Sequence, residues 1–527
     1  MFQIMRQCGV TGSVCHKTQI RNTVEPGIQT DVPGSNRRTA RAEARVLGLS
    51  VITIALYVVT WQLEGAMFRG GNVVEWIHGA PQSPASAYRE WAAYTTTTLL
   101  IFWAYGALIS MSLRGELDSG RARSYALLAP ILLNLMLLPC VPRLSMDTLS
   151  YIAHGFLGQL PGGNPLLQPV QDARDTPIGP ELAGYGWHTF PGITPYGILW
   201  TRLEIAIAHL SGMNVSAAIL LFKVIATGAS LGSAWLIWRI LGHIDPAVQL
   251  PGTLAYLWNP LILMELAGEG HNDAVMIFFA LAALAAAIAG RPAVSLIAQL
   301  LGVMSKYVSV LFLPAQLTLL WRTRRDRTQL AWQVLVALTV TAVILVVSYA
   351  PLWAGLHSFD GIVHRPYTGG SATFFSVIRW VLKHTPLRPL AGPLTTVLVT
   401  GLLFGLIVWS SVYVRDAVSF ARSCAWISLG FALIVCPEYW PWYACMPIAW
   451  ICVGELRRLF WLVFLLALVG RLTAPLELLR IHGYLGWNLS KGLTTGLGAL
   501  LPLMVLLVWC CSNVWVYPLR RKYTMSQ

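Results

Sequence analysis

The sequence predicts an all-α protein that crosses a membrane many times. Of its 527 residues, 56% are hydrophobic and 11% are charged, whereas about a quarter of the positions in a soluble globular domain are charged. The apolar residues are gathered in runs that approach the roughly 20 residues needed to span a bilayer. We therefore expect an integral membrane protein with no separate soluble domain.

The basic residues indicate how the chain is oriented. The net charge is +14, but lysines and arginines stand in short clusters between apolar runs, as they do in the cytoplasmic loops of membrane proteins. This pattern predicts a lipid bilayer as partner and no nucleic acid. The nine cysteines are scattered without metal-type spacing, so they predict neither a disulfide framework nor a metal site.

Charge and hydropathy divide the chain into a leader and one membrane domain. Residues 1–45 are polar and end in an arginine-rich stretch. Because they lack an early apolar core, we expect a disordered cytoplasmic leader rather than a cleaved signal peptide. Residues 46–527 are expected to form a single bundle of about 14 transmembrane helices. The alternation of spans places two long loops, 142–213 and 351–390, on the outer side.

Amphipathic patterns predict short helices that lie along the membrane surface in both outer loops. One follows Asp147, and others are expected at 196–210 and around 374–383. A longer apolar stretch, 293–321, is interrupted by Lys306 and predicts two short helices that meet at the lysine.

The first outer loop carries our candidate for a catalytic base. Between two apolar blocks, Ser145 to Tyr196 is polar and rich in Gly, Pro and aromatic residues. Asp147 closely follows Pro142, where an apolar run ends, so its carboxylate is expected at the membrane surface. Desolvation there raises the pKa of a carboxyl group towards the range useful for a base.

A second polar cluster is expected on the same face as Asp147. It contains Glu269, His271, Asn272 and Asp273. Three interpretations are open: Asn272 or Asp273 caps the following helix, His271 and Asp273 bind a metal, or the cluster acts on a substrate. We predict catalytic roles for Glu269 and His271, a substrate contact for Asp273, and no metal.

Two motifs in the middle third of the chain can be compared with a known family. The first loop presents Asp147, Tyr151 and Gly155, followed by GGNP at 162–165 and TPYG at 194–197. The later stretch WNPLILMELAGEGHNDA ends in a Gly-Glu-Gly-His-Asn-Asp turn. Both resemble the GT-C membrane glycosyltransferases, in particular the polyprenol-phosphate-mannose-dependent mannosyltransferases. The chain departs from the pattern in having a single Asp rather than Asp-x-Asp at the base position.

The resemblance implies a GT-C-like bundle in the cytoplasmic membrane with its active site on the outer face. It implies transfer of a hexose, with mannose favoured, from a polyprenyl-phosphate sugar to a hydroxyl group of a glycan or glycolipid acceptor. A phosphate leaves as an anion without a general acid, so one base, Asp147, suits an inverting displacement. No cofactor is expected, and the sequence has no Asp-x-Asp pair or Gly-rich phosphate loop for a nucleotide-sugar donor.

Cations are also needed for the developing phosphate charge. Lys306 is the main candidate, because a lysine within an apolar stretch is costly without a partner. Alternatively, it extends to the membrane surface or pairs with Glu265 or Glu269. Arg365 and His364 in the second outer loop are further candidates, although loop arginines are commonly solvated or bound to headgroups.

Other residues are expected to contact the substrate. Tyr151 and Tyr196 suit stacking on a sugar or packing on an isoprenoid chain, although most aromatic residues in such a chain face lipid or the core. Asn164 belongs first to a turn, and a carbohydrate contact is its second role.

Two other functions fit the composition. A transporter or flippase of lipid-linked sugars would also combine many spans with intramembrane charges, but here the polar features gather on one face instead of forming a path through the bundle. A lipid-linked glycan ligase or polymerase would need to hold a diphosphate, for which more outer-loop arginines are expected.

Overall fold

The structure, a computed structural model, describes residues 35–67, 84–185, 187, 192–363, 371–481 and 486–511. The chain divides into two units, Met1–Arg41 and Ala42–Gln527. The first helix, α1 (Ser35–Met67), begins in the first unit and continues in the second. The last residues of the expected leader are therefore helical, and the remainder of that leader lies outside the described residues.

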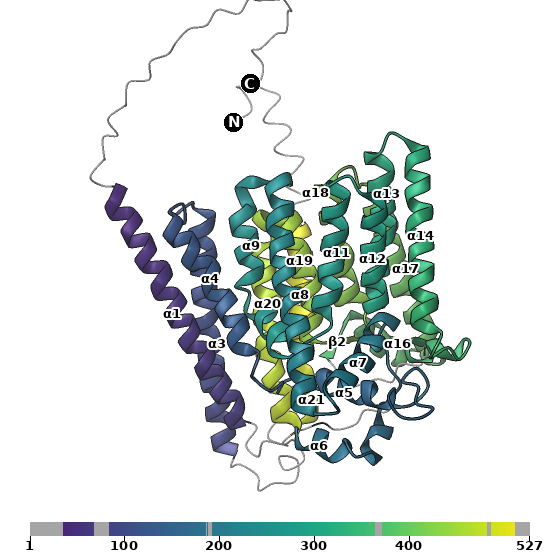
Figure 1. Cartoon of the computed structure of the whole chain (residues 1–527). Coiled ribbons are helices and arrows are strands. Elements are labelled where there is room, and N and C mark those ends of the chain that lie inside the picture. The colour runs from purple at the N-terminus through teal and green to yellow at the C-terminus, as the bar shows by residue number, and fades with distance from the viewer. Residues whose placement is uncertain are drawn as a thin grey trace, which may run out of the picture. The chain divides into compact units, whose positions relative to one another are not determined.

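The second unit is a bundle of helices, which confirms the all-α class (Figure 1). Its longest helices stand side by side, and several shorter ones gather at one end of the bundle (Figure 1). The long helices are α3 (Pro84–Leu113), α4 (Gly120–Leu137), α8 (Val215–Ile244), α14 (Arg327–Tyr349), α17 (Ala391–Val412), α18 (Ala417–Gly430), which η7 (Phe431–Val435) extends, and α20 (Leu456–Ile481).

Shorter helical elements complete the bundle. Those before the middle of the chain are α5 (Asp147–Leu157), η1 (Val170–Asp175), α6 (Gly179–Gly184), α7 (Ile198–Leu210), η2 (Pro246–Val248), α9 (Gln249–Leu257), α10 (Pro260–Ile262) and η3 (Leu263–Gly268). They are followed by α11 (Asp273–Ile288), α12 (Pro292–Ser305), η4 (Tyr307–Phe312), α13 (Leu313–Thr323), η5 (His357–Phe359), α15 (Asp360–Val363) and α16 (Phe374–Lys383). The last are η6 (Arg388–Leu390), η7 (Phe431–Val435), η8 (Pro441–Ala444), α19 (Cys445–Gly454), α21 (Trp487–Thr495) and η9 (Gly496–Leu500).

The number of membrane spans is lower than the sequence predicted. Within the described ranges, seven helices are long and apolar enough to cross a membrane, or up to eight if a bent pair counts as one. The chain is thus a polytopic membrane protein, but the expected count of about 14 spans is not supported. Apolar stretches such as Pro292–Ser305 and Pro441–Gly454 form helices shorter than a span.

Two breaks divide apolar stretches of the bundle, and both lie beside the polar residues singled out above. The helices on either side of the turn 269–272 are bent by 114°. The first of them starts where the side chain of Asn259 accepts hydrogen bonds from the amides of Leu261 and Ile262, with Pro260 as the first helical residue, a favoured helix start. The second break is at Lys306, whose extended backbone ends α12, as predicted.

The two long loops, 142–213 and 351–390, pack on one another and on the break at Lys306. The amide of Gly197 donates to the carbonyl of Ser305 at 3.3 Å, and the side chain of Asn164 donates to the carbonyl of Leu352 at 2.9 Å. The expected helices of these loops are present as α5, α7 and α16. These contacts bring residues far apart in sequence to one end of the bundle.

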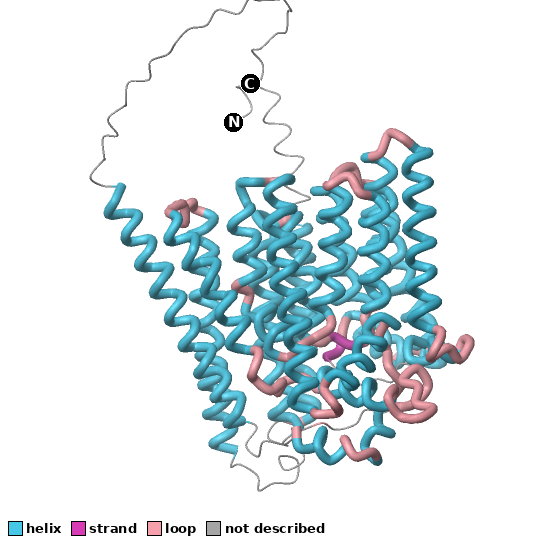
Figure 2. The backbone as a smooth tube through the Cα atoms, in the orientation of Figure 1, coloured by secondary structure: helices cyan, strands magenta, loops and turns pink. Residues whose placement is uncertain are grey.

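Two short strands join the second long loop to a later turn. β1 (Ser371–Ala372) and β2 (Glu438–Tyr439) form an antiparallel pair, which lies among the loops and helix ends (Figure 2). The pair leads directly into Trp440 and Trp442, and so places these rings beside the polar end of the bundle.

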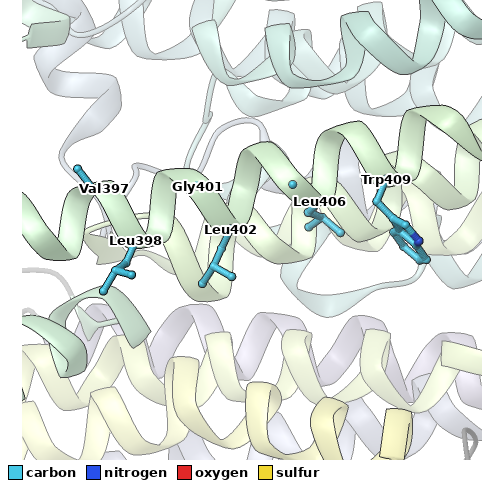
Figure 3. Close-up of a pocket in the computed structure, with 7 residues that line it drawn as sticks. Val397, Leu398, Gly401, Leu402, Leu406 and Trp409 are labelled. Carbon is cyan, nitrogen blue, oxygen red and sulfur yellow. The ribbon is translucent and has the colours of Figure 1, made fainter.

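A groove on α17 is apolar throughout. Its volume is about 640 Å³, and Figure 3 shows that its lining side chains come from one helix. With no charged residue in its lining, the groove adds nothing to the polar site described below. The lining residues are Val397, Leu398, Gly401, Leu402, Gly405, Leu406 and Trp409.

We predict that Gly155→Ala destabilises the protein. A Cβ at Gly155 would lie 2.2 Å from the backbone oxygen of Glu204, so α5 and α7 would have to separate. Such overpacking costs about 1–3 kcal/mol, and a thermal unfolding curve of the purified protein in detergent should shift to lower temperature. Gly228→Ala is the matched control, because nothing lies within 4 Å of a Cβ there. Equal unfolding temperatures for both variants would contradict the prediction.

Candidate active site

Asp147 and His271 meet in space. Asp147 is the first residue of α5, and its amide donates to the hydroxyl of Ser145 at 3.1 Å. Its Oδ2 lies 3.4 Å from Nδ1 of His271, with 27% of the Asp147 side chain exposed and none of His271. A partly exposed carboxylate backed by a buried imidazole can accept a proton from a molecule that enters the site.

His271 is held between two carboxylates and an aromatic ring. Its Nε2 lies 3.2 Å from Oε2 of Glu265, and its ring stacks on Trp442 with centroids 4.1 Å apart. Trp442 in turn stacks on Trp440 at 5.1 Å. The imidazole therefore has a fixed orientation, and its two nitrogens face separate carboxylates.

Glu265 connects this pair to a buried arginine. Oε1 of Glu265 lies 3.9 Å from Nη1 of Arg471, and Nη2 of Arg471 donates to the hydroxyl of Tyr94 at 2.6 Å. We call Asp147, His271, Glu265 and Arg471 the charge chain. Anionic groups alternate with basic ones along it, so each buried group is compensated by its neighbours.

Glu269 uses its carboxylate to hold backbone. Its oxygens accept hydrogen bonds from the amides of Arg143, Leu144 and Ser145 at 3.0–3.2 Å. Its own carbonyl accepts from the hydroxyl of Thr148 at 2.6 Å. Because the carboxylate is buried and already bonded to three amides, its position suits holding the segment before Asp147 better than transferring protons.

Lys306 pairs with Asp273, not with Glu265 or Glu269. Its Nζ lies 2.6 Å from Oδ2 of Asp273, and 17% of the lysine side chain is exposed. The ammonium also lies 5.3 Å from the ring centre of Tyr443. A lysine that is partly exposed and paired with a buried carboxylate can still bind an incoming anion through a charge-assisted hydrogen bond.

The two candidate metal ligands of the second cluster have different partners. His271 faces Asp147 and Glu265, whereas Asp273 faces Lys306. In the described ranges no group of three or more His, Cys, Asp or Glu side chains is arranged to hold a metal ion. Asn272 occupies the N-cap position of α11, but among the described residues its side chain makes no capping hydrogen bond, and the carboxylate of Asp273 pairs with Lys306.

Tyr151 lies in an aromatic cluster behind Asp147. Its ring is within 5.0 Å of Tyr196 and 5.1 Å of Trp200, measured between centroids, and its hydroxyl accepts from the amide of Asn272 at 3.4 Å. Tyr151 is fully buried, whereas Tyr196 is half-buried. Of the two tyrosines, Tyr196 is thus the better placed to touch a substrate.

Of the other predicted site residues, the structure describes Asn164 but not His364 or Arg365. Asn164 forms a turn, since its Oδ1 accepts from the amide of Leu166 at 3.0 Å while its amide group bonds to Leu352. The turn role expected first is therefore present. His364 and Arg365 lie outside the described residues.

Sequence reasoning missed Arg471 as a member of the site, and gave Glu265 only as a possible partner of Lys306. A signal existed for both, because each is an ionisable residue within an apolar helix. Trp442 was missed as well: it lies in the aromatic turn 438–443, and nothing in the local sequence connects it to His271.

A second acid–base pair lies between α5 and α7. Nδ1 of His154 is 3.7 Å from Oε1 of Glu204, and both side chains are buried. Burial raises the pKa of Glu204 to about 7, an effect that His154 partly offsets. The negative charge of Asp147 raises the pKa of Glu204 further. The protonation of Glu204 on α7, a helix outside the candidate spans, therefore depends on the charge of Asp147.

The protein is therefore a polytopic, all-α membrane protein with a buried polar site. Carboxylates, a histidine and a lysine gather in this site at one end of the bundle. The chain belongs to the family described as alpha-(1->6)-mannopyranosyltransferase, N-terminal domain, whose model matches residues 45–322. The match contains Asp147, His271 and Lys306, whereas Arg471 and Trp442 lie beyond it.

Two relatives are similar to parts of the chain. An alpha-(1->6)-mannopyranosyltransferase A of Mycobacterium tuberculosis is 25% identical over 358 residues, which cover 62% of this chain and 64% of the relative. A protein of the same name from Corynebacterium glutamicum is 26% identical over 157 residues, 29% of each chain. The matches thus span less than two thirds of the length of either relative.

We predict that Glu204 makes stability depend on pH. Because its folded-state pKa of about 7 exceeds the ordinary 4.5, the folded protein binds more protons than the unfolded chain between these values. The free energy of unfolding therefore falls as pH rises from about 5 to about 7 and levels off above. Unfolding temperatures measured across this range should show the fall in wild type and a flatter profile in Glu204→Gln. Parallel profiles would show that Glu204 does not titrate in this window.

Proposed function

We propose that the protein transfers a mannosyl residue from a polyprenyl-phosphate sugar to a hydroxyl group of a glycan or glycolipid acceptor. The proposal places the reaction on the outer face of the cytoplasmic membrane, in a GT-C-type active site. Family membership and the names of the relatives support the sugar and the reaction. The observation that carries the mechanism is the contact of 3.4 Å between partly exposed Asp147 and buried His271.

Asp147 acts as the base in this mechanism. Its carboxylate takes the proton of the acceptor hydroxyl as the hydroxyl oxygen attacks the anomeric carbon. The bond between that carbon and the phosphate oxygen breaks, and the lipid phosphate leaves with the electron pair as an anion. His271 orients the Asp147 carboxylate, and Glu265 with Arg471 holds His271 in place.

A single displacement inverts the anomeric configuration. The relatives are named alpha-(1->6)-mannopyranosyltransferases, so an alpha product made in one displacement requires a beta-linked donor. We propose a beta-linked polyprenyl-phosphate mannose for this reason.

Lys306 binds the donor phosphate in the proposed mechanism. Its side chain is 17% exposed, and the residue lies in the break between α12 and η4, next to Gly197 of the first loop. Arg365 and His364 are proposed to assist. Tyr196, Tyr151, Asn164 and Asp273 are proposed to line the sugar site. The side-chain amide of Asn272, which has no hydrogen-bond partner in the part of the chain that the structure describes, is a further group for a sugar hydroxyl.

We predict that Asp147→Asn abolishes transfer but keeps donor binding. The amide has the size of the carboxylate but cannot accept the proton, so the rate should fall by about 100-fold or more. The measurement is transfer of radiolabelled mannose from polyprenyl-phosphate mannose to membrane lipid extract by the purified protein.

Asp172→Asn is the matched control for that experiment, because Asp172 is an exposed carboxylate in the same loop. Equal rates for wild type and Asp147→Asn would move the base to another residue. If wild type transfers no sugar from any polyprenyl-phosphate donor, the enzyme assignment fails and a transporter of lipid-linked sugars becomes the better hypothesis.

We predict that Lys306→Met weakens transfer by about 100-fold through loss of one cation at the developing phosphate charge. The single variant also leaves Asp273 unpaired, which is costly in a buried site. The double variant Lys306→Met with Asp273→Asn removes both charges and separates the two effects. Steady-state transfer rates at varied donor concentration are the measurement, and a double variant as active as wild type would refute phosphate binding by Lys306.

A further inference from the structure

Lys223 is a buried charge that no step above uses. It lies within the apolar helix α8, and its side chain has no exposed surface. An ionisable residue in such a place is costly and is retained only with specific partners. Its partners therefore indicate what the residue does.

Those partners are the backbone carbonyls at the end of α4. Nζ of Lys223 donates to the carbonyl of Leu137 at 2.5 Å and also to that of Cys140. Leu137 is the last residue of α4, where carbonyl groups lack helical partners and carry partial negative charge. The lysine thus fastens the chain where it leaves the helix.

Glu269 fastens the same segment a few residues later. It accepts from the three consecutive amides that precede Asp147, beginning at Arg143. The Lys223 ammonium and the Glu269 carboxylate also attract one another. Lys223 therefore holds the carbonyl groups at the start of the connection between α4 and α5, and Glu269 holds the amides near its end. The positive and the negative charge compensate each other.

The close packing of the turn 269–272 against its neighbours requires a glycine at position 270. The φ of Gly270 is +77°, and a Cβ there would lie 2.9 Å from Oγ1 of Thr148 and 3.2 Å from Cγ of Lys223. The turn therefore packs directly between α5 and α8. The next residue, His271, contacts Asp147, so the clamp and the charge chain share adjacent positions.

We propose that Lys223 and Glu269 form a clamp that sets the position of Asp147, with Lys223 as a positioning residue for proton transfer. The inference rests on the proposed function for its catalytic consequence, but the clamp itself can be tested without it. Misplacement of a base by about 1 Å can cost about 100-fold in rate, so release of the clamp should lower kcat more than it raises the donor KM.

The first readout of the test is structural. Cys140 is half-buried within the clamped segment, so its rate of alkylation by N-ethylmaleimide, followed by mass spectrometry of the purified full-length protein, reports whether the segment is held. Lys223→Met removes the charge and both hydrogen bonds with little change in length. We expect alkylation of Cys140 to accelerate about threefold or more, because local opening governs access to a partly buried group.

The second readout is mannosyl transfer. We expect Lys223→Met to lower kcat about 10-fold or more while the donor KM changes less than about threefold, and Lys223→Arg to recover part of the rate. Thr227→Val is the matched control: Thr227 is buried one turn further along α8, and its hydroxyl has no hydrogen-bond partner within the described part of the chain. This control should match wild type in both readouts.

Each outcome decides the proposal. Unchanged alkylation in Lys223→Met overturns the clamp, even if transfer falls with the amount of folded protein. Faster alkylation with unchanged kcat overturns the positioning role. If alkylation of Cys140 is faster in Lys223→Met but the wild-type protein transfers no mannose, the clamp is retained and the proposed function is rejected. If Lys223→Met does not fold, Lys223→Gln, which keeps N–H donors but not the charge, is measured by the same two readouts.

Discussion

The constraint on which the site depends is the cost of placing charges inside an apolar bundle. Isolated charges are unstable there, and alternating charges stabilise one another only when their geometry is fixed. The charge chain satisfies this condition with residues from α5, the turn after η3, η3 itself and α20. Removal of any one of these elements would leave a charged group of another without its partner, so the site depends on the packing of the whole bundle.

The sequence predicted those parts of the site that local patterns encode. Asp147, His271 and Lys306 each stand at a helix start, a turn or a helix break, and such positions are marked by neighbouring Pro, Gly and polar residues. Which charged side chains pair with one another was less predictable. Lys306 selects Asp273 instead of Glu265 or Glu269, and Arg471 joins from about 200 residues further along, because side-chain partners depend on how distant helices pack.

The fold class was likewise predictable, whereas the number of spans was not. Mean hydropathy reports how apolar a stretch is, but not whether its helix is continuous. The bend of 114° beside the turn 269–272 and the extended residue Lys306 both divide apolar stretches. Such breaks are tolerated at membrane depth only where protein surrounds them, and these two breaks carry the polar groups of the site.

Gly155 has a mechanical consequence for how a substrate can enter. Without a side chain at this position, α5 crosses the backbone of α7 directly, and Tyr196, just ahead of α7, touches Tyr151 on α5. Close-packed elements of this kind move together as one rigid piece. A shift of α7 would thus carry Asp147 along, so we expect room for the proposed lipid-linked donor to come from neighbouring parts of the bundle, with Asp147, the proposed base, and Tyr151 moving together.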